Sequence, residues 1–147
     1  MSTSVHGVAL LARLALSAAF LSAVADRFGL YGPPGTAGVA WGDFAAFTSF
    51  TALVNPHVPA GFIPALAWTA TILEVLFGVL LTLGLLTRLA AIGSGVLLLV
   101  FALAMATSLG VKAPLDYSVL SAAAAALLLA HVGPGKWSID ALLAGRR

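Results

Sequence analysis

Residues 61–83 read GFIPALAWTATILEVLFGVLLTL and contain a single charged side chain, Glu74. The short connection 84–88 follows, and then a second apolar stretch, residues 89–109, which reads LAAIGSGVLLLVFALAMATSL. About 20 consecutive apolar residues are enough to cross a bilayer as an α-helix. The two stretches therefore predict two antiparallel membrane-spanning helices that pack against each other.

Two further apolar stretches, residues 7–26 and 116–132, predict a first and a fourth transmembrane helix. The 147 residues are 61% hydrophobic and 8% charged, and their mean hydropathy is +1.10. Soluble domains carry about 25% charged residues, so this chain has too few charges to cover a globule in water. We predict an all-α fold, a four-transmembrane-helix bundle formed by one domain over residues 1–147.

Two short segments outside the spans also have helical features. Asp43 is placed to cap a helix over residues 44–53, and aromatic side chains recur every three residues along one face: Trp41, Phe44, Phe47 and Phe50. We interpret this segment as an interfacial helix in the first loop. It anchors in the aromatic belt or, alternatively, forms a lid over the bundle. Ser138 predicts a second capped helix, in a C-terminal interfacial segment.

The distribution of basic residues predicts an orientation with both termini inside, because inner loops carry the excess of Lys and Arg. The inner side would hold Arg88, Lys136, Arg146 and Arg147, with Arg13 close to it, and the outer side would hold Arg27 and Lys112. We therefore expect a multi-pass protein of the bacterial inner membrane, with membrane lipid as its surroundings.

Several function classes are disfavoured by composition. Without cysteine the chain cannot form disulfides or use thiol chemistry. Its basic residues are scattered, so nucleic acid is not an expected partner. We find no nucleotide-binding, metalloprotease or hydrolase motif, and we predict no metal site and no covalently bound cofactor.

Arg13 and Glu74 are the two charged residues that lie away from the ends of the predicted spans, where a charge usually faces the bundle or a cavity. Counted from the inner ends of their spans, their depths differ by about 5 Å, so the two side chains are within reach of an ion pair. Ser17 lies on the face of Arg13, and Gly78 on the face of Glu74. The pair either fixes the helix register or, with Ser17 and Gly78, anchors a polar headgroup such as a quinone carbonyl, with Glu74 as a proton carrier.

A second polar cluster is expected at the outer side. Asp116 is placed to cap the fourth span, with Tyr117 beside it. Other residues near them in the predicted topology are Asp26, Arg27, Trp41, His57 and Lys112. Capping and interfacial anchoring account for these residues. The alternative is a shallow ligand site that includes Asp116 and Tyr117.

The chain resembles the DoxX family of small bacterial membrane proteins over nearly its whole length. The segments that carry the resemblance are Leu11–Leu14, Glu74–Gly78, Leu83–Ala91, Asp116–Tyr117 and Gly133–Asp140. The end of the first span, Ala25-Asp26-Arg27, departs from the Gly and Lys that are common there in the family.

The resemblance implies a membrane protein linked to redox systems. We expect a subunit of a quinone-linked oxidoreductase that binds a quinone or another lipophile as a noncovalent cofactor. The alternative is a membrane scaffold or anchor for oxidative-stress or oxidoreductase proteins, without catalysis of its own. The expected partners are a quinone and either other proteins or further copies of this chain.

Overall fold

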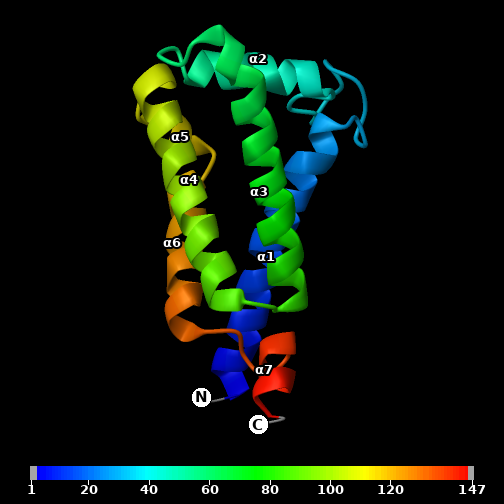
Figure 1. The fold of residues 1–147 in the computed structure, drawn as a ribbon, viewed down its shortest axis with the longest axis vertical. Coiled ribbons are helices and arrows are strands. Elements are labelled where there is room, and N and C mark those ends of the chain that lie inside the picture. Colours follow the sequence, from blue (N-terminus) through cyan, green and yellow to red (C-terminus); the bar gives the residue numbers. More distant parts are fainter. Residues whose placement is uncertain (1–2, 146–147) are drawn as a thin grey trace.

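The computed structural model describes residues 3–145, and the regular structure in that range is entirely helical. The helices α1 (Thr3–Arg27), α3 (Ile63–Leu83), α4 (Thr87–Leu109) and α6 (Val119–Val132) run along the long axis (Figure 1). Around the bundle, α1 contacts α3, α3 contacts α4, α4 contacts α6, and α6 contacts α1. The predicted all-α fold is confirmed.

The two ends of the bundle are built differently. One end carries the start of α1 and the short helix α7 (Ile139–Ala144), and we call it the terminal end (Figure 1). The other end is crossed by α2 (Phe44–Val54), and we call it the α2 end. The remaining short elements, η1 (Ala60–Phe62) and α5 (Lys112–Asp116), lead into α3 and α6.

Three helical segments are long and apolar enough to cross a membrane: Thr3–Arg27, Ala60–Leu83 and Thr87–Leu109. They correspond to the first three predicted spans. With 14 residues, α6 is about 21 Å long, shorter than the roughly 30 Å of a hydrocarbon core. The fourth crossing therefore stays a prediction.

The predicted fourth span is wrong in its first turn. Residues 112–116 form α5, and Ser118 adopts a left-handed conformation (φ 55°) that separates α5 from α6. Pro114 is tolerated in α5 because it lies in the first turn, where its missing N–H has no helical partner. Asp116 therefore ends α5 instead of capping the fourth span, and it pairs with Lys112 one turn earlier.

Local chemistry explains where the helices begin and end. Asp43 caps α2 by accepting a hydrogen bond from Ala46 N (2.7 Å), and Ser138 caps α7 by accepting one from Ala141 N (3.1 Å), as predicted. Gly84 ends α3 in the left-handed conformation (φ 65°), which glycine adopts without steric cost. The turn that follows brings α4 back beside α3.

α2 lies across the bundle and contacts α1, α3 and α4 (Figure 1). Phe47 and Val54 on its inner face are buried, whereas Asp43 and Ser49 are exposed. The structure therefore shows this segment, residues 41–54, as a lid over the end of the bundle, and its position in the membrane interface stays a prediction. The long first connection is thus an ordered cover over one end of the bundle.

Candidate functional site

A buried ion pair lies beneath α2. Arg27, the last residue of α1, contacts Glu74 of α3, and the two residues are only 2% and 3% exposed. Arg27 also donates a hydrogen bond from Nη1 to the Thr71 hydroxyl (2.9 Å), one turn before Glu74 on the same face of α3. Each of these two buried charges stabilises the other, because burying an unpaired charge costs several kcal/mol of free energy.

Aromatic rings from the lid cover the Arg27 guanidinium. Its Cζ lies 3.7 Å from the centre of the Phe47 ring and 5.1 Å from that of Trp41. The two rings meet edge to face, with centroids 5.2 Å apart. A cation over an aromatic face is attracted by the partial negative charge of the π electrons on that face. The guanidinium is thus held between a carboxylate on α3 and aromatic faces of the lid.

Asp26, the neighbour of Arg27, holds the lid at a second point. Its carboxylate accepts hydrogen bonds from the backbone N–H groups of Ala40 (2.8 Å), Trp41 (3.1 Å) and Gly42 (2.9 Å). Gly42 has a positive φ of 74°, and a Cβ there would collide with the backbone at Pro33–Pro34. Asp26 and Arg27 together therefore position Trp41 over the ion pair.

The site has spare hydrogen-bonding capacity. Arg27 Nε is buried and has no hydrogen-bond partner among residues 3–145. Buried N–H groups are nearly always paired, so one that is not calls for an explanation. An uncharged acceptor such as a carbonyl oxygen would satisfy it without disturbing the Glu74 contact.

The predicted Arg13–Glu74 pair is wrong, and Arg13 serves another purpose. Among residues 3–145, its guanidinium donates hydrogen bonds only to backbone carbonyl oxygens, those of Leu81 (2.9 Å), Thr82 (3.0 Å), Pro134 (3.1 Å) and Trp137 (2.7 Å). The first two belong to the last turn of α3, where carbonyl groups lack helical partners. Arg13 thus caps the end of α3 and fastens to it the tail, residues 133–138, which connects α6 to α7.

The error came from the depth assigned to Arg13. We assumed that the first and second spans begin and end at the same level, but α1 starts at Thr3 and extends past the end of α3 (Figure 1). Arg13 is level with Thr82, and Ser17 with Gly78. Because Glu74 lies eight residues before Thr82, it is about 12 Å further along the bundle, level with the upper part of α1.

Ser17 and Gly78 form a close contact between α1 and α3 and do not line an open space. Ser17 Oγ hydrogen-bonds to the Gly78 carbonyl (2.8 Å) and to the Thr82 hydroxyl. A Cβ on Gly78 would come within 2.9 Å of the Leu21 side chain. Close approach at small residues is typical of membrane helix pairs. The predicted headgroup pocket between Arg13 and Glu74 is therefore closed.

The second predicted cluster is spread out. Asp116 and Tyr117 are exposed at the α2 end, and Asp116 pairs with exposed Lys112. His57 is also exposed. Only Asp26, Arg27 and Trp41 meet, and they meet Glu74. As ligand-binding candidates, Asp116 and Tyr117 remain predictions.

Arg27 was not predicted as the partner of Glu74, because the sequence favoured an interfacial anchoring role for Arg27. One signal was present: Asp26-Arg27 adjoins a loop rich in aromatic residues. In antiparallel helices, the end of α1 lies beside the first half of α3, and the long Arg27 side chain reaches Thr71 and Glu74 near the middle of that helix. Within residues 3–145 no cluster of three or more His, Cys, Asp or Glu side chains is arranged to hold a metal.

A second polar network, at the terminal end, connects α7 to the turn between α3 and α4. The Asp140 carboxylate accepts hydrogen bonds from the backbone N–H groups of Leu86 (2.8 Å) and Thr87 (2.8 Å), and Asp140 N donates to the Gly84 carbonyl (3.0 Å). Partial burial raises the pKa of Asp140, but the hydrogen bonds from Thr87 and Leu86 and the nearby Arg13 charge outweigh it and hold the pKa below its ordinary value. Asp140 therefore caps the N-terminus of α4 from a distant part of the chain.

Together these features define a helical membrane protein with a buried ion pair beneath an aromatic lid. A family model described as TQO small subunit DoxD matches residues 52–147, well over half of the sequence. The chain belongs to this DoxX-like family, and the resemblance is confirmed. No curated protein and no solved structure gives a significant match to the chain.

The matched residues include α3, Glu74 and the whole tail, whereas Asp26, Arg27 and the first part of the lid precede residue 52. The motif segments around Leu83–Ala91 and Gly133–Asp140, which carried the resemblance, form the network at the terminal end. Their role in this structure is to close helix ends.

Proposed function

We propose that this chain is a membrane subunit of a quinone-linked redox complex, and that it binds a quinone or a similar lipophile at the Arg27–Glu74 pair. The observation that carries this proposal is the unpartnered, buried Nε–H of Arg27 beneath the rings of Phe47 and Trp41. Ionisable residues inside membrane domains usually mark functional sites. The family description, which names a small subunit, supports a partner protein.

The chemistry of the site suits a quinone headgroup. A quinone carbonyl accepts a hydrogen bond from Nε–H, and the quinone ring stacks on aromatic side chains. Glu74 would keep the guanidinium oriented through the ion pair. In this arrangement the chain supplies binding and orientation, while a partner subunit supplies electrons.

A series of ring contacts that connects exposed aromatic side chains to the ion pair supports access from the bilayer. Trp68 and Phe28 are exposed beside the lid, and Phe44 packs against both, with ring centroids 4.3 Å and 5.8 Å away. Phe44 in turn lies 5.9 Å from Phe47, which covers Arg27. A flat apolar molecule in the membrane would meet the exposed rings of Phe28 and Trp68 at the outer end of this series of contacts.

The proposal includes a topology. We infer that α6, extended by α5, makes the fourth crossing of a bacterial inner membrane, with both termini inside. The terminal end is then cytoplasmic, and the ion pair lies near the outer side.

The alternative is a scaffold that holds partner proteins without binding a quinone. The close contact between Ser17 of α1 and Gly78 of α3 favours it, because the two helices leave no room for a ligand at that level. The two functions differ in whether the purified chain binds a quinone.

The decisive experiment titrates the detergent-purified chain with decylubiquinone and follows binding by native mass spectrometry and tryptophan quenching. Arg27→Lys keeps a cation beside Glu74 but removes the planar guanidinium and its Nε–H. We expect about ten-fold weaker binding in this variant, which corresponds to one lost hydrogen bond.

Ser49→Ala is the matched control, because Ser49 lies on the exposed face of α2 and bonds only within that helix. It should bind like wild type. Well-folded wild-type protein that binds no decylubiquinone would favour the scaffold function. Equal binding by wild type and Arg27→Lys would show that the quinone does not bind at Arg27.

A further inference from the structure

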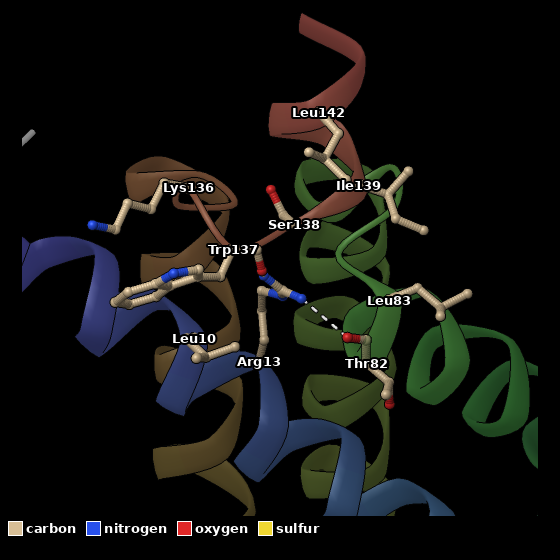
Figure 2. Close-up of a pocket in the computed structure, with 9 residues that line it drawn as sticks. All are labelled: Leu10, Arg13, Thr82, Leu83, Lys136, Trp137, Ser138, Ile139 and Leu142. Carbon is tan, nitrogen blue, oxygen red and sulfur yellow. Dashed lines mark hydrogen bonds between the residues drawn. The ribbon is translucent and has the colours of Figure 1, made fainter. Parts of the chain in front are cut away.

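A groove opens at the terminal end, away from the Arg27–Glu74 site. It has a volume of about 390 Å³ and lies between the start of α1, the end of α3 and the tail that leads into α7. Figure 2 shows Lys136 and Trp137 on one side, Leu83, Ile139 and Leu142 on the other, and Arg13 between them.

The lining of this groove is mostly apolar. Leu10, Leu83, Ile139 and Leu142 contribute aliphatic side chains, and Leu142 is 67% exposed. The exposed Trp137 ring forms one side, and the Lys136 ammonium lies 4.6 Å from its centre. A hydrocarbon chain fits such a lining, whereas a free phosphate or another small ion does not.

The charge at this end is positive. Arg13, Arg88 and Lys136 are the basic residues placed there in residues 3–145, and Asp140 is the single acidic one; the other four acidic residues of the chain lie elsewhere. Asp140 is occupied by backbone N–H groups, and the Arg13 donors are met by uncharged carbonyl oxygens. The charges of Lys136 and Arg88, both exposed, are therefore available to an anion.

The position along the bundle matches the boundary between hydrocarbon and headgroups. Leu83 is the last residue of α3, and the groove begins at this level. Tryptophan and lysine beside the end of an apolar helix are typical of the membrane interface, where the ring meets the headgroup region.

We propose that this groove binds one anionic phospholipid. An acyl chain lies along Leu10, Leu83 and Leu142, and the phosphate is held by Lys136 next to the Trp137 ring. The site is separate from the proposed quinone site, and the proposal holds whether or not the chain binds a quinone.

The test uses delipidated full-length protein in a neutral detergent, titrated with dioleoylphosphatidylglycerol or dioleoylphosphatidylcholine and measured by native mass spectrometry. The two lipids share their acyl chains and differ in net charge. We expect phosphatidylglycerol to bind about five-fold more tightly, the effect of roughly 1 kcal/mol per basic residue at an anionic surface.

Lys136→Gln should abolish this preference, and Leu142→Asn should weaken binding of both lipids. Lys112→Gln is the matched control, because Lys112 is also an exposed lysine but lies at the α2 end, and it should keep the preference. Equal binding of the two lipids by wild type, or the same loss in Lys112→Gln as in Lys136→Gln, would overturn the proposal and leave the groove to a segment of a partner protein.

Discussion

The two arginines of α1 are buried by different means. Arg13 is surrounded by carbonyl oxygens at the end of α3 and in the tail, so partial charges of the backbone stabilise it. Arg27 is stabilised by a full carboxylate and two aromatic rings. Substitution of the two arginines therefore has different consequences. Removal of Arg27 would leave the charged Glu74 carboxylate buried and unpaired, whereas removal of Arg13 would leave only uncharged carbonyl oxygens.

We predict that Arg27→Met alone destabilises the protein by about 3–5 kcal/mol, because Glu74 is left buried without a counter-charge. The double variant Arg27→Met/Glu74→Leu should recover most of this loss, since no buried charge remains. The measurement is the unfolding free energy from denaturant titration in mixed micelles. A double variant as unstable as Arg27→Met would contradict the prediction.

The exposed Lys112–Asp116 pair is the internal control for this cycle. Breaking it with Lys112→Gln should change the unfolding free energy very little, because exposed ion pairs contribute little to stability.

Glu74, Asp43 and Ser138 were identified from the sequence alone because their signals are local. A carboxylate in an apolar helix and a polar residue before a helix can be identified without knowing the fold. The partners of Arg13 and Glu74 could not, because they depend on how far α1 slides along α3. That offset is visible only in the folded structure, where α1 extends past the end of α3 and the tail packs against both helices.

At the scale of elements, α4 depends on a residue far away in the sequence. No side chain near Leu86 caps its N-terminus, and Asp140 supplies the missing acceptor from 53 residues beyond Thr87. Caps within one helix can be read from neighbouring residues, as for α2 and α7. The cap of α4 was missed because the tail must fold back to provide it.

We predict that Asp140→Asn lowers stability at pH 7 by about 1–2 kcal/mol, because the amide loses the negative charge at the start of α4 and one of the two oxygens that accept from Leu86 N and Thr87 N. The pKa of Asp140 is lowered in the folded protein, so its contribution is complete above the ordinary value of about 3.9 and is lost as the pH falls through the folded-state pKa.

Thermal unfolding of wild type and Asp140→Asn between pH 7 and pH 3 checks this. The difference in stability should be constant above about pH 5 and should shrink below pH 4. An unchanged difference at pH 3 would show that the carboxylate charge is not what α4 needs.

At the scale of the molecule, the ring of α1, α3, α4 and α6 brings both ends of the described chain together. His6 Nδ1 accepts a hydrogen bond from Lys136 N (3.3 Å), so the start of α1 and the tail lie on the same side. Apolar composition predicted the bundle, because membrane helices need about the same length and little charge. It did not predict the break before α6, which depends on the left-handed backbone of Ser118.

The proposed topology can be tested because the chain has no native cysteine. We predict that Lys112→Cys reacts with a membrane-impermeant maleimide in intact cells, whereas Ser4→Cys and Lys136→Cys react only after permeabilisation. Reaction at Ser4→Cys and Lys136→Cys in intact cells, with Lys112→Cys protected, would reverse the orientation and contradict the prediction.

The dependence of α4 on Asp140 also has a consequence for biosynthesis. Gly84 and Thr87 leave the ribosome long before Ser138 and Asp140, so α3 and α4 enter the bilayer with the turn between them still open. Until the tail arrives, Arg13 and the start of α4 lack several of their final partners. The nascent protein would therefore remain a substrate for quality-control proteases until residues 138–140 are made, and shortening the chain before residue 138 should reduce its abundance in the cell.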